Sequence, residues 1–172
     1  VTDISPEFVI DRLITLNKLL GSGKYIVVTN LMGILRYLPN TKLYKNKIID
    51  INKDMDIDRD DFINKLFDLG YEKKPVVSRT GEMAIRGYVI DIFPIEFDNP
   101  IRIEFWGDTI DSIKYFDLED QISNTSVDSV KIYPYTEFLI DGKIEDNIIR
   151  KQKYLLNYSD SVSGLWDYVS DS

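Results

Sequence analysis

Arg102, Glu104 and Trp106 occupy every second position of one short segment, RIEFW, and their side chains are of types that bind other proteins. Successive side chains of a β-strand point to opposite faces, so the three would share one face and the apolar residues between them the other. Arginine and tryptophan are enriched at binding hot spots. The spacing therefore predicts a protein-binding face. The alternative that spacing leaves open is an ion pair between Arg102 and Glu104, with Trp106 covering a sheet edge.

Arg86, in the segment before this strand, is the next candidate. If Ile85, Gly87 and Val89 point toward the core, then Arg86 and Tyr88 point outward, because strand side chains alternate. Cross-strand neighbours come within side-chain reach, so Arg86 is expected on the same face. Since all these candidates project from strands, their truncation to alanine is expected to leave the fold nearly intact.

Carboxylates in the same region could instead serve a hydrolase, which needs two of them close together. Asp91, Glu104, Asp108 and Asp111 are available, but the sequence gives no sign that any two converge. Turn positions and solvated strand positions explain Asp108 and Asp111 without chemistry. We therefore expect no catalytic residue in this region.

Two further motifs resemble ligand sites. The segment 21–24, GSGK, lacks the glycine and the Ser or Thr of a phosphate-binding loop, which fall here on Lys18 and Tyr25. The alternating aspartates of residues 54–60 resemble a calcium loop, but the twelfth position, where the bidentate glutamate belongs, is Lys65. We expect neither a nucleotide, a metal nor another cofactor to bind.

A sheet must position the candidate residues, and residues 84–120 predict three antiparallel strands with a tight turn at Gly107. Further strands are expected over 43–51 and 127–133. A helix is expected from Asp58 to Gly70, and a set of apolar residues at helical spacing should face the core. These residues are Phe62, Ile63, Leu66, Phe67 and Leu69.

The flanking segments predict helices and one more strand. Ser5 and Pro6 are typical of a helix start, and Gly21 is expected to end that helix in the left-handed conformation. A strand over 25–29 and a short helix over 31–37 should follow, and the period of residues 144–156 predicts a helix near the C-terminus. The expected fold class is α+β.

The predicted organisation has three parts. A partial α/β segment spans residues 1–42, a β-rich antiparallel module with a packed helix spans 43–138, and a helical tail over 139–172 returns toward the first segment.

Composition excludes several functions. The chain has no cysteine and no histidine, which removes disulfides, thiolate metal sites and the commonest general base. A net charge of -8 opposes nucleic-acid binding by the whole chain, because phosphate contacts need clustered Lys and Arg. No apolar run is long enough for a membrane span and no signal peptide opens the chain, so we expect a cytoplasmic protein without a membrane partner. The absence of an initial methionine suggests a piece of a longer protein.

The central region resembles the N-terminal UvrB-like module of the bacterial transcription-repair coupling factors, the Mfd family, on the motifs GYEKKPVVSRTGEMAIRGYVIDIFP and PIRIEFWGDTIDSIKYFD. The resemblance extends from SPEFVIDRLITLNKLL through IVVTNLMGILRYLP to YPYTEF, about residues 5 to 138. The excision-repair helicase UvrB shares the patterns RGxxxxIFP and RIEFFGDxID, so the UvrA-binding region of UvrB is the alternative.

The resemblance implies a non-catalytic fragment of an ATP-dependent DNA translocase, in a module that has lost its nucleotide-binding motif. Such a fragment would bind UvrA and recruit it to stalled RNA polymerase, while other domains would bind the polymerase and DNA. The family's UvrA contacts correspond here to Arg86, Arg102 and Trp106, with Glu104 a weaker candidate. Phenylalanine is usual at the position of Trp106, so the contact there would differ in shape.

Overall fold

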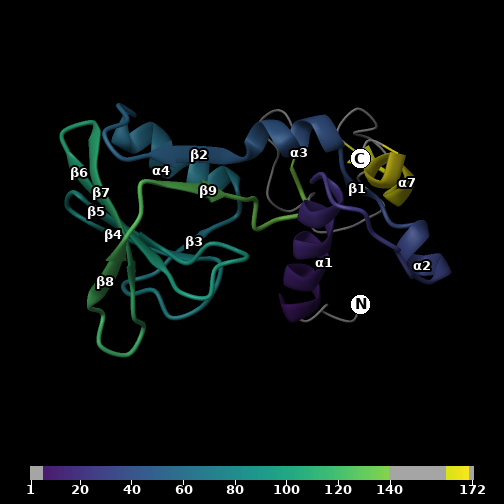
Figure 1. Cartoon of the computed structure of the whole chain (residues 1–172), viewed down its shortest axis with the longest axis horizontal. Helices are drawn as coiled ribbons and strands as arrows, with labels where there is room; N and C mark the ends of the chain where they lie inside the picture. Colours follow the sequence, from purple (N-terminus) through teal and green to yellow (C-terminus); the bar gives the residue numbers. More distant parts are fainter. Residues whose placement is uncertain (1–5, 140–161, 171–172) are drawn as a thin grey trace. The chain divides into compact units, whose positions relative to one another are not determined.

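The computed structural model describes residues 6–139 and 162–170 of the chain. The chain divides into two compact units (Figure 1). Each unit has its own hydrophobic core. The first unit consists of Val1–Lys47 and Thr136–Ser172, and the second unit of Ile48–Tyr135. Helices and strands occur in comparable amounts with a largely antiparallel sheet, so the predicted α+β class is confirmed.

The first unit is mainly helical. Its elements are α1 (Pro6–Leu19), α2 (Leu31–Ile34), β1 (Leu38–Pro39), α3 (Thr41–Lys47), β10 (Val162–Ser163) and α7 (Leu165–Ser170). β1 pairs antiparallel with β10, and the hydroxyl of Tyr168 donates to the carbonyl of Pro39 at 2.8 Å. Leu16, Leu19, Leu38 and Tyr168 form its small core, which holds α1, β1 and α7 together.

Two predictions for the first unit are wrong and a third is confirmed only in part. Residues 25–29 form no regular strand, because the described residues offer no neighbouring strand to pair with their backbone, and Ile26 and Val28 are exposed. Gly21 is not left-handed, since α1 ends instead through a tighter hydrogen bond from the Gly21 N–H to the carbonyl of Lys18. The helix predicted over 31–37 exists and begins at Leu31 as predicted, but it ends early and comprises only the four residues of α2. The helix predicted over 144–156 lies outside the described residues.

The strand predicted over 43–51 is also wrong for most of its length. Helix α3 occupies its first part, because the side chain of Asn40 accepts hydrogen bonds from the N–H groups of Lys42 and Leu43 and so begins a helix there. Only β2 (Ile49–Asn52) is a strand, and it pairs antiparallel with β9 (Ser129–Ile132) in the second unit.

The second unit is built around a six-stranded sheet with the order β3-β4-β5-β6-β7-β8. Neighbouring strands are antiparallel except for β3 and β4, which are parallel. The strands are β3 (Glu72–Lys73), β4 (Glu82–Arg86), β5 (Val89–Ile92), β6 (Ile101–Trp106), β7 (Thr109–Phe116) and β8 (Ser123–Ser126). Residues 84–120 therefore hold four strands rather than the predicted three, because Gly87, at φ +59°, turns the chain between β4 and β5.

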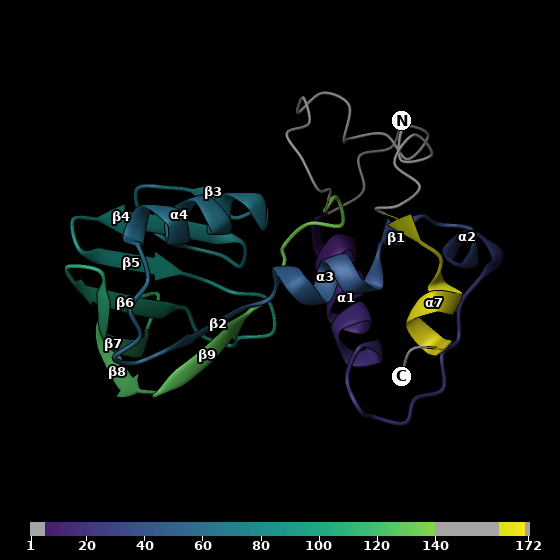
Figure 2. The ribbon, with the colours of Figure 1, turned by 90° about the horizontal axis from the view of Figure 1, so that it is seen from above.

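Helix α4 (Arg59–Asp68) packs against one face of this sheet (Figure 2). Asp58, where the helix was expected to begin, is its N-cap, because its side chain accepts from the N–H of Asp61 at 2.7 Å. Phe62 and Leu66 pack in one apolar cluster with isoleucines of β5 and β6, and we call this cluster the main core. The prediction that Phe67 faces the core is wrong, because its side chain lies on the exposed side of α4. None of the described helices has the length and hydropathy needed to cross a bilayer.

Candidate functional site

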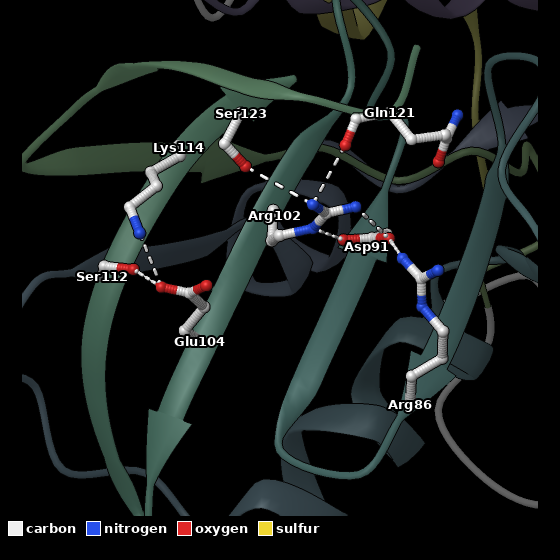
Figure 3. Close-up of polar contacts among 8 residues, drawn as sticks. All are labelled: Arg86, Asp91, Arg102, Glu104, Ser112, Lys114, Gln121 and Ser123. Atoms are coloured by element: carbon white, nitrogen blue, oxygen red, sulfur yellow. Dashed lines mark hydrogen bonds and ion pairs between the residues drawn. The ribbon is translucent and has the colours of Figure 1, made fainter. Parts of the chain in front are cut away.

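The strand β6 alternates as its sequence predicts. Ile101, Ile103 and Phe105 are buried in the main core, which α4 covers, and the residues between them lie on the opposite face. The register places Asp91 of β5 opposite Arg102 and places Ser112 of β7 opposite Glu104. Polar residues from four neighbouring strands, β4 to β7, therefore share one face of the sheet (Figure 3). We call it the polar face, and its residues are Arg86, Asp91, Arg102, Glu104, Ser112 and Lys114.

A buried carboxylate on β5 joins the two candidate arginines. Asp91 is only 1% exposed, and its oxygens accept from Arg102 Nε at 2.7 Å and Arg102 Nη2 at 3.0 Å. Arg86 Nη2 from β4 donates to the same carboxylate (Figure 3). The two arginines therefore converge on Asp91.

Arg102 is tied to the protein on more than one side. Its Nη1 donates to the backbone carbonyl of Gln121 at 3.2 Å, and its guanidinium carbon lies 4.7 Å from the centre of the Phe116 ring. The hydrogen bond to Asp91 raises the pKa of the Arg102 guanidinium, so the side chain stays charged. Only 16% of its side chain is exposed, against 47% for Arg86. The face predicted from the sequence is thus partly an internal ion-pair cluster.

Glu104 belongs to a separate contact on the polar face. Lys114 Nζ lies 2.7 Å from its carboxylate, and the Ser112 hydroxyl donates to the same oxygen. The alternative pairing of Arg102 with Glu104 is therefore wrong, because Arg102 is committed to Asp91 and Glu104 to β7. The hydrogen bond from Lys114, then that from Ser112, lowers the pKa of Glu104 below its ordinary value, against the opposing effect of burial.

This contact makes the stability of the sheet depend on acid pH. The pKa of Glu104 is lower in the folded state than in the unfolded state, so the ionised carboxylate stabilises the folded protein. This contribution is fully present above the unfolded-state pKa of about 4.3, and it is lost as the pH falls through the lower, folded-state pKa. Lys114→Gln removes the main donor and is expected to move the Glu104 pKa back toward the ordinary value, as measured by NMR titration of the carboxyl carbon.

A matched control for this titration is Lys74→Gln. Lys74 also forms an ion pair, with Glu72 at 3.0 Å, but it follows β3, which is an edge strand of the sheet and is not adjacent to β6. The Lys74→Gln variant removes one positive charge, as Lys114→Gln does, and should leave the titration midpoint of Glu104 unchanged. A midpoint that stays low in Lys114→Gln would show that Lys114 does not hold this carboxylate.

Trp106 ends β6 and is the most exposed of the candidates, at 82%. The register of β6 and β7 shifts between Glu104 and Phe105, which re-aims the side chains that follow. Phe105 still packs into the core, while Trp106 stands at the strand end before the turn at Gly107. Trp106 lies four residues along the strand from Arg102, about 13 Å at the usual rise per residue.

Tyr88, expected on the outward face of a strand, lies instead in the turn between β4 and β5 and is exposed. Its carbonyl accepts from the N–H of Phe105 at 2.9 Å, so this turn lies beside the end of β6. The exposed aromatic residues Tyr88 and Trp106 therefore belong to neighbouring parts of the sheet. Sequence reasoning did not identify Tyr88 as a contact candidate, although its position next to Gly87 is typical of an exposed turn.

Asp91 is the residue whose role sequence reasoning missed. The sequence suggests for it only a place in a hydrolytic pair, whereas in the structure it anchors two arginines. A signal exists in its pattern, because Asp91 stands between Ile90 and Ile92, which face the core, and so must point to the same face as the arginines. Across residues 6–139 and 162–170, no group of three or more acidic side chains could hold a metal ion.

Comparison with known proteins gives a consistent set of relatives. The family model of the UvrB interaction domain matches residues 49–138. A transcription-repair-coupling factor of Staphylococcus haemolyticus is 37% identical over 140 residues, which are 81% of this chain and 12% of that protein. One of Staphylococcus epidermidis is 33% identical over 155 residues, 90% of this chain and 13% of that protein. The chain spans about an eighth of the length of these curated relatives.

Proposed function

The chain belongs to the UvrB interaction domain family, in the form that transcription-repair coupling factors carry, and we propose that it binds the nucleotide-excision-repair protein UvrA. It would act by binding rather than by catalysis. The matched region, residues 49–138, includes the whole six-stranded sheet and its polar face. The residues proposed to make up the binding face are Arg86, Arg102 and Trp106, with Glu104 beside them.

The observation that carries the proposal is the exposure of Trp106. A side chain of this size is normally covered in a monomeric protein, and tryptophan is among the residues most enriched at binding hot spots. It projects from a strand of the six-stranded sheet, so the backbone that carries it is already ordered before a partner covers it. Arg86, nearly half exposed on β4 of the same sheet, supplies a charged donor for carboxylates of that partner.

A wider role follows from the resemblance of the sequence to transcription-repair coupling factors. Within a longer bacterial protein of the cytoplasm, this module would recruit UvrA to stalled RNA polymerase. The polymerase and DNA would be bound by other domains, and ATP-driven translocation on DNA would reside there. The net charge of -8 makes direct nucleic-acid binding by this chain unfavourable.

The proposal is tested by mixing the purified chain with UvrA from the same organism and measuring association by titration calorimetry. We expect a saturable complex. Duplex DNA at low salt, where electrostatic binding is strongest, is the control partner and should give none. The absence of a UvrA complex at tens of micromolar of each protein, with both folded, would contradict the proposal.

A further inference from the structure

The three members of the ion-pair cluster differ sharply in what they expose. Asp91 is covered, Arg102 is mostly covered, and Arg86 is the member with a large accessible surface. Arg102 directs three of its nitrogens to acceptors within the chain, two to Asp91 and one to the carbonyl of Gln121. A guanidinium whose donors are used in this way has little left to offer a partner.

We infer that Arg86 is the arginine that contacts the partner, and that Arg102 and Asp91 are positioning residues that hold its guanidinium in place. This inference rests on the proposed binding of UvrA through the polar face. The arginine fork on Asp91 fixes the carboxylate between β5 and β6, and the carboxylate in turn restrains the Arg86 side chain from β4 (Figure 3). Arg86 would thus be preorganised before the partner arrives.

Preorganisation and simple charge attraction predict opposite effects of one substitution. The cluster of two arginines and one aspartate carries a net charge of +1, and Asp91→Asn raises it to +2. If charge alone attracted an acidic partner surface, this variant would bind more tightly. If Asp91 positions Arg86, the variant must order a freed arginine on binding and should bind about fivefold more weakly, the factor that ordering one long side chain is worth.

A double-mutant cycle on UvrA affinity tests this, using wild type, Asp91→Asn, Arg86→Ala and the double variant. Asp91→Asn should weaken binding in the wild-type background and change it by less than about twofold once Arg86 is absent. A purely structural role of Asp91 would weaken binding by the same factor in both backgrounds. That additive result, or tighter binding by Asp91→Asn, would overturn the inference.

Arg102→Lys provides a second route if Asp91→Asn fails to fold. Lysine keeps the positive charge but cannot donate as a planar fork, so the anchoring of Asp91 is weakened without a change in net charge. In the same cycle with Arg86→Ala, Arg102→Lys should weaken UvrA binding only while Arg86 is present.

Wild-type affinity of Arg86→Ala would refute the proposed binding face itself. Weaker binding by Arg86→Ala, together with an additive cycle, would refute only the positioning role.

Discussion

Arg102→Ala is expected to lower the free energy of unfolding of the second unit by about 2 to 3 kcal/mol. The change removes both nitrogens of the fork on Asp91, a carboxylate with almost no access to water. Loss of one partner of a buried ion pair costs roughly 3 to 5 kcal/mol, and the remaining donor from Arg86 reduces the penalty here. Urea unfolding, followed through the amide signals of β5 and β6, would measure it.

Lys131→Ala is the matched control for that measurement. It also removes a cation that faces an aspartate on a paired strand, but Lys131 is 60% exposed and lies 3.9 Å from Asp50. Such a solvated pair contributes little, so the cost should stay below about 1 kcal/mol. Equal losses for the two variants would show that the Arg102 fork adds nothing to stability. The sequence predicts that each binding candidate can be replaced by alanine with little loss of stability. In the structure this expectation holds for the exposed residues Arg86 and Trp106, and not for the covered Arg102.

Trp106→Ala is expected to weaken UvrA binding by about thirtyfold and to leave the stability of the sheet nearly unchanged. Truncation of an aromatic hot-spot residue commonly costs about 2 kcal/mol or more, which corresponds to that factor. The indole is 82% exposed in the free chain, so its removal leaves no cavity in the core. Titration calorimetry with UvrA measures the first effect and urea unfolding the second.

The parts of the fold that the sequence predicted are those set by local rules. The alternation of β6 follows from the two-residue period of a strand, and the start of α4 follows from Asp58 as its cap. The turn at Gly107 needs a positive φ, which glycine provides without strain. Each of these depends on a few consecutive residues, and a sequence pattern contains all of them.

The errors in the first unit arise where pairing or capping decides between structures. The β-branched residues 25–29 have the propensity of a strand, but a strand also needs hydrogen-bonding neighbours, and the described residues supply none there. The segment from Leu43 has an apolar pattern that suits either structure. The side chain of Asn40 caps a helix there, and this local contact outweighs strand propensity.

The sequence predicts which face of the sheet the candidate residues occupy, but it does not predict which side chains they contact there. Periodicity correctly placed Arg86, Arg102 and Glu104 away from the main core. It could not show that Arg102 would be covered, because its partners Asp91 and Gln121 come from other segments. The pairing of side chains across a sheet depends on the register of its strands, and the register that places Asp91 opposite Arg102 is not visible in the pattern of either strand alone.

The most direct test of the account compares the UvrA affinity of Trp106→Ala with that of Trp166→Ala. The chain has two tryptophans of almost equal exposure, 82% and 78%, one in each unit. The two variants remove the same side chain and the same apolar surface, and only Trp106 belongs to the sheet that carries the polar face. We predict a loss of about thirtyfold for Trp106→Ala and wild-type affinity for Trp166→Ala. Equal affinities of the two variants, or a loss confined to Trp166→Ala, would contradict the assignment of the binding face.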